Sequence, residues 1–135
     1  MSVIEIRDVA DHVFPTLEDV LKALPERARR SSWTVSSYTC ADGESYFWLG
    51  GGGTDELDAI ADSGGRVTAE AFAALAQATS QVIWGSFAGY DEGEPAPWIR
   101  LHAFDSTFWR CETDDVAAQQ ALMSSFKDVR VVAQP

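Results

Sequence analysis

Three residues in the C-terminal third combine the side-chain types that nucleophilic catalysis needs: Cys111, His102 and Asp105. A cysteine attacks as its thiolate, so it requires a neighbouring base or a helix N-terminus to take its proton. His102 and Cys111 lie on successive expected strands, which a hairpin would place side by side. However, Cys111 alternates with Trp109 and Thr113, as a packed strand residue does. We therefore predict no catalytic residue, and keep these three as the alternative.

Two glycine-rich passages invite a phosphate or a metal ion, but both lack the necessary ligands. Gly50 to Gly53 run directly into Asp55 and Glu56, with no lysine nearby, so a phosphate would meet repulsion. Residues 62–72 resemble the second half of an EF-hand calcium loop. Only Asp62 stands at a ligand position with a side chain that can bind calcium, and calcium takes six to eight oxygens. Ser86 also lacks the G-x-S-x-G pattern of a nucleophile elbow. The sequence predicts no metal site and no cofactor.

The negative charge is concentrated in the middle of the chain. The formal net charge is −11, and residues 31–99 carry ten Asp and Glu against one base, Arg66. Asp55, Asp58 and Asp62 recur at i, i+3 and i+7, which places them on one face of a helix. Such a field favours a cationic partner. The expected partner-binding residues are Asp55, Glu56, Asp58, Asp62, Asp91, Glu92, Glu94 and Trp98.

Charge and hydropathy also exclude partner classes. Nucleic acid and anionic membrane surfaces are poor partners, because phosphate binding requires clustered Lys and Arg. The one basic cluster, Arg27, Arg29 and Arg30, falls at the end of an expected helix, where it complements the helix dipole. No run of about 18 apolar residues would span a membrane. The charged first residues do not suit a secretory signal, so we expect a cytoplasmic protein.

Hydrophobic periodicity predicts one α+β domain over residues 1–135, with a largely antiparallel sheet of five to six strands and two to three helices. Pro25 is expected to stop or kink the first helix near Leu24. Expected helices cover residues 17–29, 69–79 (after the Thr68 cap) and 114–126 (after the Thr113 cap), with a shorter amphipathic stretch from Thr54. Six strands are expected over residues 33–40, 44–49, 82–90, 98–104, 108–112 and 129–132, with a hairpin turn at Asp42-Gly43, and residues 3–6 are a further short candidate.

In the strand at 98–104, Ile99, Leu101 and Ala103 suit a core face, which leaves the aromatic and charged residues on the other face. We expect this second face to be covered, as in a central strand; the alternative is an exposed aromatic recognition surface. The leading hypothesis is a non-enzymatic acidic binding protein, such as a bacterial immunity or antitoxin-like inhibitor of a basic protein. The alternative is a small enzyme or ligand-binding domain with a pocket on the aromatic face. A third is a homo-oligomer joined through that face.

Overall fold

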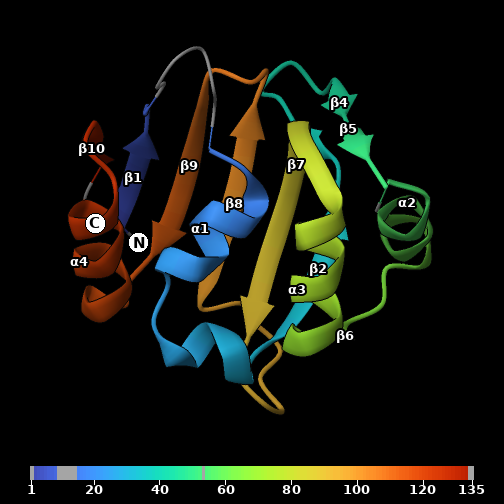
Figure 1. Cartoon of the computed structure of the whole chain (residues 1–135), viewed down its shortest axis with the longest axis horizontal. Helices are drawn as coiled ribbons and strands as arrows, with labels where there is room; N and C mark the ends of the chain where they lie inside the picture. The colour runs from blue at the N-terminus through green and yellow to red at the C-terminus, as the bar shows by residue number, and fades with distance from the viewer. Residues whose placement is uncertain (1, 9–14, 53, 134–135) are drawn as a thin grey trace.

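The computed structural model describes residues 2–8, 15–52 and 54–133, and it is a single α+β fold (Figure 1). The α-helices are α1 (Leu17–Ala23), α2 (Thr54–Ser63), α3 (Ala69–Ala78) and α4 (Val116–Ser125), and a 3-10 helix, η1, spans Glu26–Arg30. The strands are β1 (Ser2–Ile6), β2 (Ser32–Ser36), β3 (Tyr38–Thr39), β4 (Ser45–Tyr46), β5 (Trp48–Gly51), β6 (Val67–Thr68), β7 (Thr79–Tyr90), β8 (Ile99–Phe104), β9 (Phe108–Thr113) and β10 (Val129–Ala133). None of the helices in these ranges is long and apolar enough to cross a membrane.

The main sheet is antiparallel and has eight strands, in the order β10-β1-β9-β8-β7-β2-β6, with β5 also paired to β7. The twelve-residue strand β7 organises it. Along one edge, β7 pairs first with β5, over residues 79–84, and then with β2, over residues 86–90. The chain between β2 and β5 leaves the sheet as the hairpin of β3 and β4. Of the strands in this sheet, only β6, which is two residues long, falls outside the expected strand ranges.

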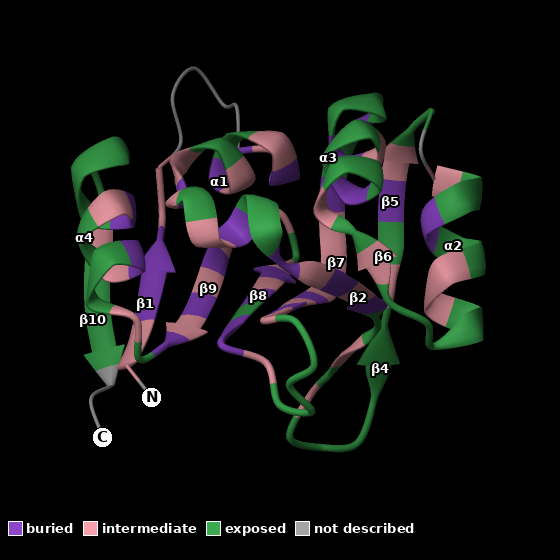
Figure 2. Cartoon of the chain, turned by 90° about the horizontal axis from the view of Figure 1, so that it is seen from below, coloured by how far each residue is buried: buried purple, intermediate pink, exposed green. Residues whose placement is uncertain are grey.

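Helices α1, α3 and α4 cover one side of the sheet, and the β3–β4 hairpin projects from the other side (Figure 2). The predicted alternation of β8 is confirmed, since Ile99, Leu101 and Ala103 are fully buried beneath the helices. Phe72 of α3 stacks on Trp33 of β2, with ring centroids 5.0 Å apart. Each such side chain contributes roughly 1.5–3 kcal/mol through burial, so the helix side is the core.

The expected end of the first helix near Leu24 is confirmed. Helix α1 stops at Ala23, and residues 26–30 form the separate turn η1 after Pro25, whose ring prevents the α-helix from continuing. The expected cap of the last helix at Thr113 is wrong. Asp115 caps α4 by accepting hydrogen bonds from two backbone amides, whereas Thr113 ends β9 and is buried.

The expected pairing of residues 33–40 with 44–49 holds only at the turn. Tyr38 and Thr39 pair with β4, but β2 and β5 both pair with β7 instead. The glycine run serves this packing: Gly51 has a φ of +110°, and a Cβ there would lie 2.4 Å from the backbone nitrogen of Ser80. Gly53 lies outside the described residues. Thr68 caps α3 as expected, by accepting a hydrogen bond from the Ala71 amide.

Candidate functional site

The side of the sheet that faces away from α1, α3 and α4, here called the open face, carries polar and aromatic side chains from three strands. Strand register places them side by side, since Ser86 pairs with His102 and His102 with Arg110. No helix of the described ranges lies over this face (Figure 2). The expectation that both faces of β8 are covered therefore holds only in part, since the β3–β4 hairpin packs on His102 and Phe104 but leaves Arg100 exposed. The open-face residues are Trp84, Ser86, Ala88, Tyr90, Arg100, His102, Phe104, Phe108, Arg110 and Glu112.

A chain of three hydrogen-bonded side chains, here called the relay, crosses the middle of this face. Ser86 Oγ lies 2.7 Å from His102 Nδ1, and His102 Nε2 lies 3.0 Å from Glu112 Oε1. Ser86 of β7 directly faces His102 of β8, whereas Glu112 of β9 is the diagonal neighbour of His102, because it faces Arg100. The His102 side chain is only 12% exposed. The arrangement is thus a hydroxyl, an imidazole and a carboxylate held in line.

The ionised Glu112 carboxylate assigns the proton positions in the relay. A carboxylate only accepts hydrogen bonds, so neutral His102 must donate from Nε2–H and keep Nδ1 as an acceptor. Ser86 then donates its hydroxyl proton to Nδ1. Burial lowers the pKa of His102 below its usual value, against the opposing effect of Glu112. His102 is therefore neutral at pH 7, and the Ser86 hydroxyl is oriented toward it.

A polar pocket of about 580 Å³ opens beside the relay. Ser86, His102, Glu112 and Arg100 line it on the sheet side. The side chain of Arg100 is exposed and forms no hydrogen bond or ion pair with a described residue. The remaining lining residues come mainly from β2, β3 and the far end of β7: Thr34, Ser36, Ser37, Tyr38, Thr39, Phe87, Ala88 and Tyr90.

An aromatic row adjoins the polar pocket, made of Tyr46, Trp84, Tyr38, Phe104 and Phe108 in contact order. Ring centroids lie 4.8 Å apart for Tyr46 and Trp84, 4.3 Å for Tyr38 and Phe104, and 4.7 Å for Phe104 and Phe108. The hairpin supplies Tyr38 and Tyr46, so it forms one wall of the open face. Aromatic pairs of this kind stabilise by about 0.5–1.5 kcal/mol beyond their burial, which holds the wall in place.

Arg110 lies over the far end of the row. Its guanidinium carbon is 4.8 Å from the Phe104 ring centroid, and it donates to Glu5, which also accepts from Arg7. These two arginines lower the pKa of Glu5 despite its burial. The Nε of Arg110 is buried without a hydrogen-bond partner. Arg7 and Arg110 are thus committed to Glu5, unlike Arg100.

The structure does not bring the three predicted catalytic candidates together. His102 lies on the open face, while Cys111 is fully buried on the opposite, helix-covered side. Burial raises the pKa of the Cys111 thiol far above its usual value, so it stays protonated. Asp105 is exposed in the turn between β8 and β9, with a φ of 47°. Both cysteines are free thiols.

The expected partner-binding residues fall into three places. Asp55, Glu56, Asp58 and Asp62 are exposed on α2, at one edge of the molecule, and none forms an ion pair with the described Lys and Arg. Glu92 and Glu94 are exposed in the loop that joins β7 to β8, at the end of the sheet (Figure 1). The remaining two residues, Asp91 and Trp98, act within the fold. The acidic residues therefore do not form one patch.

Arg27 contacts both Asp91 and Trp98. Its Nε lies 3.0 Å from Asp91 Oδ1, and its Nη1 lies 3.0 Å from Asp115 Oδ2. The guanidinium also covers the Trp98 ring, at 4.4 Å. Trp98 is buried and donates to Ser31 through its indole N–H. This cluster joins η1, the β7–β8 loop and the α4 cap, which is a structural role.

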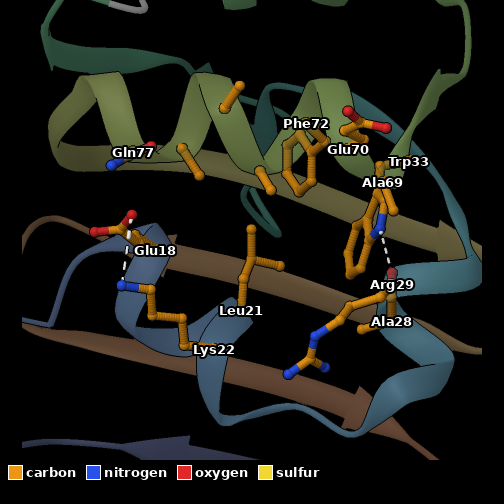
Figure 3. A pocket seen from close by; sticks show the side chains of 13 residues that line it. Glu18, Leu21, Lys22, Ala28, Arg29, Trp33, Ala69, Glu70, Phe72 and Gln77 are labelled. Atoms are coloured by element: carbon orange, nitrogen blue, oxygen red, sulfur yellow. Dashed lines mark hydrogen bonds and ion pairs between the residues drawn. The ribbon is translucent and has the colours of Figure 1, made fainter.

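A second hollow, of about 460 Å³, lies on the helix side between α1, η1 and α3 (Figure 3). Its floor is the stacked pair Trp33 and Phe72, and Leu21 points into it. At its rim Lys22 pairs with Glu18, and Arg29 donates to the carbonyl of Leu24. These rim cations are held by their own segment. We therefore place the candidate site in the polar pocket rather than here.

Sequence reasoning did not name Ser86, Arg100 or Glu112 as site residues, although alternation places Arg100 with His102 on the second face of its strand. The signal was present in the alternation of the strands. Ser86 and His102 lie an even number of positions from aromatic residues of their own strands, so each shares a face with them. Glu112 directly follows the core residue Cys111, so it points to the opposite face. Two consecutive hairpins place these three residues on one face.

In the described ranges no three His, Cys, Asp or Glu side chains gather into a set that could hold a metal ion. Comparison of the chain with protein-family models, with curated proteins and with solved structures found no match.

Proposed function

We propose that this protein is a non-catalytic ligand-binding domain whose site is the polar pocket on the open face. One observation carries the proposal: the unpaired cation Arg100 lies beside the ordered relay of Ser86, His102 and Glu112 in a pocket of about 580 Å³. Natural ligand sites have this size, with a few well-placed polar groups beside aromatic walls. The aromatic row supplies such a wall.

The backbone favours binding over turnover. A serine nucleophile needs donors aimed at the oxyanion that forms, and backbone N–H groups usually supply them. Ser86 lies in the middle of β7, between β2 and β8, where the ladder engages the amide groups. The relay therefore orients a hydroxyl and an imidazole for recognition, without the surroundings that acyl transfer requires.

Backbone amide NMR tests this proposal with a panel of small probes: acetate, sulfate, glycine and glucose. We expect at least one probe to shift signals of residues in β7, β8, β9 and the 34–39 segment. Shifts confined to the helix side, or none with any probe, would contradict the proposal. Sedimentation of the same sample reports whether self-association through the aromatic row changes those signals instead.

A second candidate function is recognition of a basic protein, as an inhibitor or an immunity protein would perform it. The observation that favours it is that Asp55, Asp58 and Asp62 are exposed on α2 without ion pairs. Complementary charge speeds association and loses its effect in salt.

Binding of a lysine-rich peptide at low salt tests this candidate. The triple variant Asp55→Asn, Asp58→Asn, Asp62→Asn should weaken binding more than a control that neutralises Glu26, Glu44 and Glu70, which are exposed elsewhere. Equal weakening would mean that only net charge matters, and α2 would not be a recognition site.

A further inference from the structure

We infer that the polar pocket binds an oxyanion, either a carboxylate or a tetrahedral phosphate-like group, on Arg100, and that His102 takes up a proton when the anion binds. The inference rests on the proposed function and adds to it the chemical class of the ligand and a link to pH. Two observations carry it: the unpaired state of Arg100 and the direction of the hydrogen bonds in the relay.

Arg100 is the anchor for the anion. Glu112 is its direct cross-strand partner, where an ion pair of Arg with Glu is favoured. Glu112 instead accepts from His102, and Arg100 forms no hydrogen bond or ion pair in the described ranges. A guanidinium matches the geometry of carboxylate and phosphate oxygens. The net charge of −11 repels anions overall, so the attraction for an anion in this pocket must come locally from the uncommitted Arg100.

The relay connects the anion to a proton. When His102 is neutral, the Ser86 hydroxyl donates its hydrogen bond to Nδ1, so it cannot donate one to a ligand. When His102 is protonated, Nδ1–H donates to Ser86 Oγ, and the Ser86 hydroxyl proton turns toward the pocket. One protonation therefore adds both a positive charge and a hydrogen-bond donor beside the bound anion.

The charged groups around His102 set the sign of this coupling. Glu112 on β9 favours the imidazolium, while Arg100 on β8 and Arg110 on β9 oppose it. The Tyr38 ring packs edge-on at 5.3 Å and carries no charge at neutral pH. A bound anion neutralises Arg100 and adds negative charge, so it favours protonated His102. Anion binding and protonation therefore strengthen each other.

Isothermal titration calorimetry with sulfate and with acetate tests the inference, in buffers of different ionisation enthalpy and with chloride at matched ionic strength. The difference between buffers gives the protons taken up for each anion bound. We expect between zero and one proton, and an affinity that falls as the pH rises, by up to about tenfold for each pH unit. The sulfate and acetate arms distinguish the phosphate-like ligand from the carboxylate ligand.

Two substitutions of charge separate the pocket from the rest of the surface. Arg100→Gln should weaken binding by about tenfold or more, as expected for loss of a charge-assisted contact. Arg30→Gln removes an exposed arginine that lies outside the polar pocket and should leave binding within about twofold. Equal effects of the two variants would show adventitious binding and overturn the inference.

The relay variants test the coupling itself. His102→Asn should abolish proton uptake. Ser86→Ala should weaken binding below the pKa of His102 and leave it nearly unchanged at pH 8, because the hydroxyl serves the anion only when His102 is charged. A uniform loss at both pH values would indicate a merely structural role. If glucose or glycine shifts the pocket signals and neither anion does, the proposed function stands and this inference fails.

Discussion

Arg100 and Glu112 lie directly opposite each other on β8 and β9, yet Glu112 gives its carboxylate to His102, 3.0 Å away. The hydrogen bond between Glu112 and His102 leaves Arg100 without an ion pair and fixes the orientation of the imidazole. Both consequences matter for the open face: one creates a cation without a partner, and the other orients the Ser86 hydroxyl. Each can be measured without knowing the natural ligand.

The pKa of His102 should report its contact with Glu112. Because Glu112 raises that pKa against the effect of burial, Glu112→Gln should lower it further. Asp105→Asn is the control, since Asp105 lies in the exposed turn and should leave the titration unchanged. NMR titration of the imidazole signals measures both. A His102 pKa that rises in Glu112→Gln would contradict the stabilising effect of Glu112 on the protonated imidazole.

Stability should depend on pH through the same residue. The folded protein holds the His102 pKa below its ordinary value of 6.5, so the unfolded chain binds the proton more readily. The stability contributed by neutral His102 is complete above about pH 6.5 and is lost as the pH falls toward the folded pKa. Urea unfolding from pH 8 to pH 5 should show a steeper loss for the natural protein than for His102→Asn. Parallel curves would refute this assignment.

Arg27 should matter more to folding than any other arginine outside the open face. It joins Asp91, Asp115 and Trp98, so Arg27→Gln should lower the free energy of unfolding by about 1–3 kcal/mol, at the lower end because the guanidinium is partly exposed. Arg30→Gln should change it by less than about 0.5 kcal/mol. Chemical denaturation compares the two, and equal values would remove the structural role assigned to Asp91 and Trp98.

The two thiols should differ sharply in reactivity. Cys111 is fully buried with a raised pKa, whereas Cys40 is half-buried near the hairpin turn. A thiol reagent at pH 7.5 should label one cysteine in the folded protein and both in urea. Cys111→Ser should also destabilise the fold by about 1–3 kcal/mol, because it buries a hydroxyl. Fast labelling of Cys111 in the folded state would reopen the thiolate hypothesis.

Local signals predicted the local features. The alternation of β8, the stop at Pro25 and the Thr68 cap each depend on a few neighbouring residues, and each is confirmed. The pairing of β2 with β7 joins residues 50 to 58 positions apart, which a hairpin signal at Asp42-Gly43 cannot reveal. The contacts of Arg27 with Asp91 and Asp115 span 64 and 88 positions, so two residues of its cluster were expected to bind a partner instead.

The candidate site could be predicted from the sequence only in part. Strand alternation alone places Ser86, His102 and Glu112 on one face, but only the register shows that they touch. The choice of Glu112 between Arg100 and His102 depends on side-chain geometry in a folded sheet. That choice is the origin of the free guanidinium.

The pKa of His102 with and without saturating sulfate tests the central claim most directly, because sulfate keeps its charge over the pH range concerned. Binding of the anion beside Arg100 should raise that pKa in the natural protein and leave it unchanged in Arg100→Gln. An identical His102 pKa with and without sulfate in the natural protein would contradict the assignment of the open face as an oxyanion site.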